Sequence, residues 1–152
     1  MRPQSKAILL GGLIGGVLDL TFALCFGASH GITPGGLLRI IASGAFGKAA
    51  MDMGVAGAAC GVLFHFGLSL FWAALFAAIA SRLRMVGARP WLFGPVFGVV
   101  VFLTMRLVVL PLSAYPLPVR FSMPGAFYDL LSHMFLFGLP IALANRAMAT
   151  RR

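Results

Sequence analysis

Residues 125–145 read GAFYDLLSHMFLFGLPIALAN, an apolar stretch long enough to cross a bilayer, and they include Asp129 and His133. On a helix these two residues lie one turn apart on the same face. The row continues through positions 125, 137, 141 and 145, so one stripe holds most of the polar atoms. Because ionisable groups are costly at membrane depth, they face a bundle interior. The stretch therefore predicts a membrane-spanning helix with one polar, inward-facing side.

The composition extends this prediction to the whole chain. Its 152 residues are 61% hydrophobic and 10% charged, with a mean hydropathy of +1.00, far from the values of a soluble domain. We predict an all-α integral membrane bundle, a single domain over residues 1–152. Its four transmembrane helices are expected at about 7–28, 56–80, 92–111 and 125–145. An extracytoplasmic amphipathic or re-entrant segment, too short and too charged to span, is expected at about 34–52.

The basic residues indicate orientation. A net charge of +9 would suggest nucleic acid as a partner of a soluble protein, but here the basic residues lie in loops and tails, where they orient spans and contact anionic lipid. Eight fall on one side of the predicted bundle: Arg2, Lys6, Arg82, Arg84, Arg89, Arg146, Arg151 and Arg152. Three fall on the other: Arg39, Lys48 and Arg120. The positive-inside rule then predicts cytoplasmic termini. Because orientation and lipid contacts account for the basic residues, no nucleic-acid partner is expected.

Small-residue rows predict where the spans pack. Glycine pairs spaced by four residues let helix backbones approach closely in a membrane. The pairs are Gly11 with Gly15, Gly57 with Gly61, and Gly94 with Gly98. Steps of four residues from each pair lead to an ionisable side chain: Asp19, His65 and Arg106, respectively. The packing faces therefore also carry the polar groups.

We predict that five polar residues form one buried cluster, with a binding or a structural role. They are Asp19, His65, Arg106, Asp129 and His133, which lie about 7 to 14 Å from the outer ends of their spans at 1.5 Å per residue. This depth places the cluster in the outer half of the bundle. The simplest role for Arg106 is a buried ion pair with Asp19 or Asp129 that fixes helix register. We expect Asp19 to be the partner, with Asp129 as the alternative.

The histidines leave three interpretations open. The simplest makes His65 and His133 hydrogen-bonded interior residues, with no cofactor. In the second, their similar depth on separate helices suits a metal ion or a b-type haem, with Arg106 near a propionate. The third is a proton or solute pathway that includes Asp19 and Asp129. With only four spans, such a transporter would act as a dimer.

The sequence carries no enzyme signature. Cys25 and Cys60 lie at comparable depth and are either free, small buried residues or a disulfide on an oxidising face. The chain lacks the CxxC pair of the four-helix vitamin K epoxide reductase type. GxxxxGK[ST], HExxH and a spaced Ser-His-Asp arrangement are missing too. A non-enzymatic role is therefore favoured.

In four features the chain resembles a group of small bacterial inner-membrane proteins of no known activity. They are GGLIGGVLDLTFA at 11–23, IASGAFG at 41–47, a histidine in the second span, and HMFLFGLPIAL at 133–143. The resemblance implies four spans in a bacterial inner membrane and nothing about mechanism.

Two classes of function follow. The first is a non-enzymatic binding or accessory bundle, as a homo-oligomer or beside a partner membrane subunit. The second is a haem- or metal-binding redox protein, or a proton-coupled transporter, that uses the same cluster.

Overall fold

The computed structural model describes residues 2–119 and 121–149, and this part of the chain is helical with no strand. The helices, in chain order, are α1 (Pro3–Ser29), α2 (Pro34–Phe46), the 3-10 helix η1 (Gly47–Met51), α3 (Gly54–Arg82), α4 (Arg84–Ala88), α5 (Pro90–Thr104), the π-helix η2 (Met105–Val109), α6 (Leu110–Leu112), α7 (Gly125–Leu131), the π-helix η3 (Ser132–Gly138) and α8 (Leu139–Ala149).

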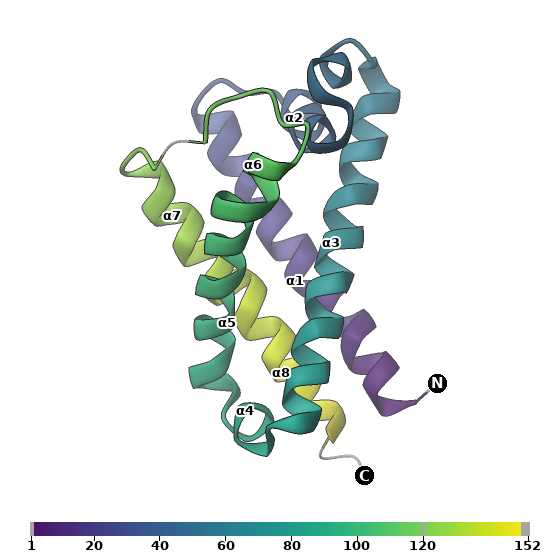
Figure 1. Cartoon of the computed structure of the whole chain (residues 1–152), viewed down its shortest axis with the longest axis vertical. Coiled ribbons are helices and arrows are strands. Elements are labelled where there is room, and N and C mark those ends of the chain that lie inside the picture. Colours follow the sequence, from purple (N-terminus) through teal and green to yellow (C-terminus); the bar gives the residue numbers. More distant parts are fainter. Residues whose placement is uncertain (1, 120, 150–152) are drawn as a thin grey trace.

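Four continuous helical stretches are long and apolar enough to cross a membrane: Pro3–Ser29, Gly54–Arg82, Pro90–Leu112 and Gly125–Ala149. The predicted all-α fold and its four long apolar helices are confirmed, and most of their ends extend a few residues beyond the expected bounds. The stretches run along the long axis of the molecule, and both chain ends lie at the same end of it (Figure 1). We call this the terminal end, and the other the capped end.

The basic residues divide between these two ends as the sequence predicts. Arg82 and Arg146 each belong to the last turn of a helix at the terminal end, where α4 connects α3 to α5. There the Arg146 guanidinium donates to the Ala88 carbonyl. Lys48 lies in η1 at the capped end. Arg120, Arg151 and Arg152, which contributed to the orientation argument, lie outside the described residues.

The segment at 34–52 folds as α2 followed by η1, at the capped end of the bundle (Figure 1). Pro34 occupies the first turn of α2, and the Thr33 hydroxyl caps this helix by accepting a hydrogen bond from the Gly36 amide at 3.1 Å. The loop after α6, described over residues 113–119 and 121–124, is hydrogen-bonded to α2, with the Ala114 amide donating to the Gly44 carbonyl at 2.9 Å. The helix and the loop together cover the capped end.

The tandem glycines of α1 allow two neighbours to pack closely. A Cβ on Gly11 or Gly15 would press against the last span, and one on Gly12 or Gly16 against α3. Each of the two overlapping GxxxG patterns therefore holds one neighbour. The other predicted glycines meet backbone in the same way: Gly57 and Gly61 contact η1 and α2, and Gly94 and Gly98 contact η3 and α8.

An apolar core fills the half of the bundle nearer the terminal end. The ring of Phe97 packs edge-on against Trp72 and Phe76, with centroids 6.2 and 5.1 Å apart, a favourable arrangement of aromatic quadrupoles. Phe76 and Ile141 are each only 1% exposed. This core separates the polar residues of the capped half from the terminal end.

The two π-helices have a common origin in the sequence. Each ends two residues before a proline: η2 before Pro111, and η3 before Pro140. Proline has no amide hydrogen, and its ring clashes with the carbonyl four residues earlier, so the preceding turn widens. Such wide turns are rare and recur at functional sites. Here they hold Arg106 and His133.

Candidate functional site

A cavity of about 600 Å³ lies in the capped half of the bundle. Residues of α1, α2, α3, α5, η2, α6, α7, η3 and the loop after α6 line it. Its wall includes all five residues of the predicted cluster: Asp19, His65, Arg106, Asp129 and His133. The rest of the wall is mostly apolar, with rings of Phe64, Phe102 and Tyr115. The fold thus brings four spans together around one polar-lined space.

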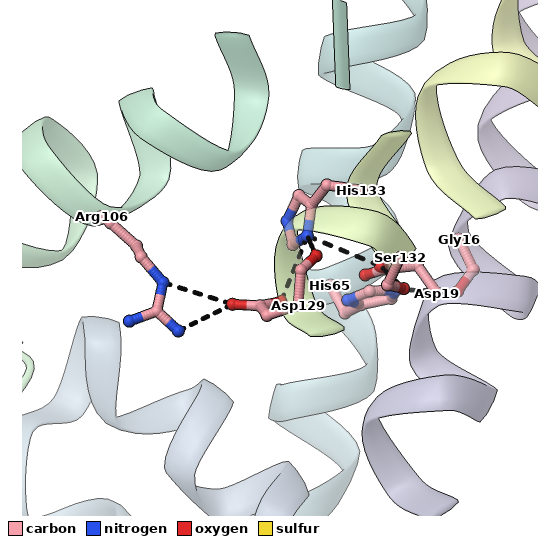
Figure 2. A network of polar contacts seen from close by, with 7 residues as sticks. All are labelled: Gly16, Asp19, His65, Arg106, Asp129, Ser132 and His133. Carbon is pink, nitrogen blue, oxygen red and sulfur yellow. Dashed lines mark hydrogen bonds and ion pairs between the residues drawn. The ribbon is translucent and has the colours of Figure 1, made fainter. Parts of the chain in front are cut away.

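Arg106 and Asp129 form an ion pair across the cavity wall (Figure 2). Nη2 and Nε of Arg106 donate to Oδ2 of Asp129 at 2.7 and 3.2 Å. The guanidinium carbon lies 5.1 Å from the ring centroid of Phe102 and 5.4 Å from that of Phe121, within the range of cation–π attraction. The rings limit access of water to the cation. The pair joins η2 to α7.

The expected pairing of Arg106 with Asp19 is wrong. One oxygen of Asp19 accepts from the Ser132 hydroxyl at 2.7 Å and lies 3.8 Å from Nδ1 of His133. The reason is depth along the bundle: the sequence already places Asp129 closer to the level of Arg106. The glycine contacts of α1 with the last span then bring Asp19 beside η3.

His133 lies between the two carboxylates (Figure 2). Its Nδ1 is 2.9 Å from the Asp129 carbonyl oxygen, 3.2 Å from Oδ1 of Asp129 and 3.8 Å from Oδ1 of Asp19. Because these atoms can only accept, Nδ1 carries a hydrogen. Nε2 makes no hydrogen bond within the described part of the chain, so a neutral ring offers a lone pair there.

His65 connects α3 to α1. Its Nε2 is 2.8 Å from the Gly16 carbonyl oxygen, so Nε2 carries the hydrogen and Nδ1 keeps the lone pair. Bis-histidine haem ligation through Nε2 would require loss of this bond. The edge-on Phe102 ring, 5.7 Å from the His133 ring, narrows the space further. In residues 2–119 and 121–149, no group of three His, Cys, Asp or Glu side chains is placed to hold a metal ion.

The disulfide alternative for Cys25 and Cys60 does not hold in this structure, because both thiols are free. Cys25 is exposed on α1. Cys60 precedes Gly61, whose Cβ position lies against the backbone of Leu38 in α2. The free-thiol alternative therefore describes this structure, but Cys25 is exposed and Cys60 only partly buried, so the expected burial of both is wrong.

Sequence reasoning missed three parts of the site. Ser132 precedes His133 and lies off the row that Asp129 and His133 define, so the row gave no signal for it. The rings of Tyr115 and Phe121 belong to the loop after α6, which folds back over the cavity and the guanidinium. Proline-rich composition marked this segment as irregular but could not indicate where it folds.

No protein-family model, curated protein or solved structure matches this chain. The site must therefore be interpreted from its own geometry. The resemblance to small bacterial inner-membrane proteins stays a prediction.

Proposed function

We propose that this protein is a non-enzymatic binding or accessory bundle of the bacterial inner membrane that holds a small amphiphile in its capped half. One observation carries the proposal: a cavity of about 600 Å³ joins a polar wall to apolar walls. Ligand pockets of about 300 to 1,000 Å³ commonly combine mostly apolar linings with a few placed polar groups. An amphiphile matches both kinds of wall.

The apolar core favours binding over a transmembrane relay. A proton or solute pathway needs polar groups or water along its whole length. Between the cluster and the terminal end, the described core consists of residues such as Trp72, Phe97 and Ile141. The polar groups therefore form a local site rather than a path across the bundle. A partner subunit or a second copy would be needed to extend it.

The charge distribution supports cytoplasmic termini and an extracytoplasmic capped end. In this orientation α2 lies at the outer interface, and the basic residues at the terminal end face the anionic lipids of the cytoplasmic leaflet. The cavity then belongs to the outer half of the membrane.

Reporter fusions test the orientation. We expect a reporter that works only in the cytoplasm to be active when fused after Arg152 and inactive when inserted after Leu117, in the loop at the capped end. A periplasmic reporter should give the opposite pattern. Activity of the periplasmic reporter at the C-terminus would contradict the proposed orientation.

Filling the cavity tests the binding function. The side chain of Ala23 lines the cavity, so Ala23→Trp should displace a bound amphiphile by occupying its space. The measurement is native mass spectrometry of the full chain in nanodiscs with added dodecanol, dodecylammonium or laurate. We expect at least one probe to bind the unaltered protein and to be lost in Ala23→Trp.

The matched control is Ala78→Trp, an exposed position of α3 that does not line the cavity. It should retain binding. If none of the three probes binds the unaltered protein, or if both tryptophan variants bind equally, the proposed function is wrong.

A further inference from the structure

A second cavity, of about 490 Å³, lies at the terminal end of the bundle (Figure 1), and we call it the terminal cavity. The beginnings of α1 and α4 and the ends of α3 and α8 line it, and it shares no described lining residue with the cavity of the capped half. Because α1 and α3 have 27 and 29 residues, they are longer than the roughly 20 residues that cross the hydrocarbon core. Their ends therefore reach the level of the lipid headgroups.

The described wall of the terminal cavity carries polar side chains from four helices: Gln4, Ser81, Arg84 and Asn145. Asn145 ends the inward row that also carries Asp129 and His133, and it is half-buried. Its side-chain amide makes no hydrogen bond within the described part of the chain. Because most polar groups away from water have a partner, this amide is available to a ligand.

Arg84 gives the terminal cavity a positive charge that no acidic side chain balances. The chain has three acidic residues, and all of them lie in the capped half: Asp19 and Asp129 at the cavity there, and Asp52 at the end of η1. Among the described residues, Arg84 makes no ion pair and no side-chain hydrogen bond. The residues outside the described ranges add no acidic side chain, and those that follow Ala149 include two arginines. The terminal cavity therefore attracts an anion.

We propose that the terminal cavity binds the headgroup of an anionic phospholipid, with the phosphodiester at Arg84 and a headgroup hydroxyl at the Asn145 amide. Basic pockets between transmembrane helices are a general mode of binding anionic headgroups, and a guanidinium pairs with two phosphate oxygens at once. An amide can both donate to a hydroxyl and accept from it. An ammonium headgroup would find no carboxylate in this wall. A phosphoglycerol headgroup supplies both features that the wall requires, one negative charge and free hydroxyls.

A lipid is favoured over a soluble phosphate because apolar side chains share the wall. Ala7 and Ala77 line the terminal cavity and are each 3% exposed, and Met148 lines it beside them. These side chains suit the apolar part of a lipid next to its headgroup. The inference goes beyond a general attraction of basic residues to the bilayer surface, since it assigns one headgroup to one site. It is also independent of what the capped half binds.

The test compares phosphatidylglycerol, phosphatidylethanol and phosphatidylethanolamine with identical acyl chains, by native mass spectrometry of the full chain released from detergent. The first two lipids carry the same negative charge, only the first has headgroup hydroxyls, and the third is zwitterionic. We expect phosphatidylglycerol to bind about fivefold more tightly than phosphatidylethanolamine, which corresponds to about 1 kcal/mol for one basic residue near a membrane surface. Phosphatidylethanol should lie between them. Arg84→Gln should reduce the preference over phosphatidylethanolamine to about one, because it removes that charge.

Arg89→Gln is the matched control, because Arg89 carries the same charge, is exposed and does not line the terminal cavity. A general attraction between lipid and basic residues predicts equal losses in the two variants, whereas a defined site predicts a loss in Arg84→Gln alone. Asn145→Leu tests the hydroxyl contact. This variant should bind phosphatidylglycerol and phosphatidylethanol equally and still prefer both to phosphatidylethanolamine.

Equal binding of the three lipids by the unaltered protein, or equal losses in Arg84→Gln and Arg89→Gln, overturns this inference. A preference for phosphatidylglycerol over phosphatidylethanol that persists in Asn145→Leu also overturns it. Displacement of bound lipid by glycerol 3-phosphate in solution would assign the site to a soluble phosphate and overturn the lipid source. Ala23→Trp alters only the capped half and should leave the lipid preferences intact, so this inference and the proposed function can fail separately.

Discussion

Replacing Gly98 by alanine is expected to destabilise the protein by about 3 kcal/mol, the upper end for overpacked interiors. The new Cβ would overlap the carbonyl of His133 and approach the Cα of Met134. The obstacle is backbone, which cannot change rotamer, so α5 and η3 must separate. The separation would also move His133 and open the cavity. Thermal unfolding in detergent, followed by circular dichroism, measures the loss.

Gly67 supplies the control for this substitution. A Cβ at Gly67 meets nothing within 4 Å, although this glycine also lies in a membrane-length helix. Gly67→Ala should therefore leave the unfolding temperature unchanged or raise it, because alanine favours helix over glycine by up to about 1 kcal/mol. Equal effects of the two substitutions would contradict close packing of α5 on η3.

Replacing Arg106 by glutamine is expected to destabilise the bundle by about 2 to 3 kcal/mol. Breaking a fully buried ion pair on one side costs about 3 to 5 kcal/mol, and the pair here is partly exposed, with side-chain exposures of 21% for Arg106 and 35% for Asp129. The loss arises because the Asp129 carboxylate keeps its charge in a poorly solvated wall. Thermal unfolding of the single and double variants measures it.

The partner choice is tested by a double-mutant cycle. Asp129→Asn in the Arg106→Gln background should cost less than Asp129→Asn alone, since no unpaired charge is then left. Asp19→Asn should give closely additive losses with Arg106→Gln, because Asp19 contacts Ser132 and His133 instead. Coupling of Arg106 to Asp19, without coupling to Asp129, would refute the described pairing.

Predicting the cluster was within reach of the sequence, whereas predicting its pairing was not. Rows of four residues link the glycines of each span to an ionisable side chain, because small and polar residues both need the bundle interior. Those rows predicted the five wall residues and their place in the half of the bundle away from the chain ends. The depths estimated from them placed Asp129 only a few ångströms nearer than Asp19 to Arg106. That difference is too small to fix the partner, since ion-pair geometry changes with shifts of a few ångströms along and around the helices.

The sequence alone determined that this chain forms four apolar helices, with α2 between the first two and polar side chains on the packing faces. These properties depend on local composition and on the period of the helix, so they can be read without neighbours. Only the tertiary structure decided that Asp129 forms the ion pair with Arg106, that His65 hydrogen-bonds to the Gly16 carbonyl, and that the loop after α6 covers a cavity. Each of these features depends on how closely two backbones approach and on the direction in which the π-helices orient the side chains. The approach of the backbones is determined by contacts between segments that are distant in the sequence.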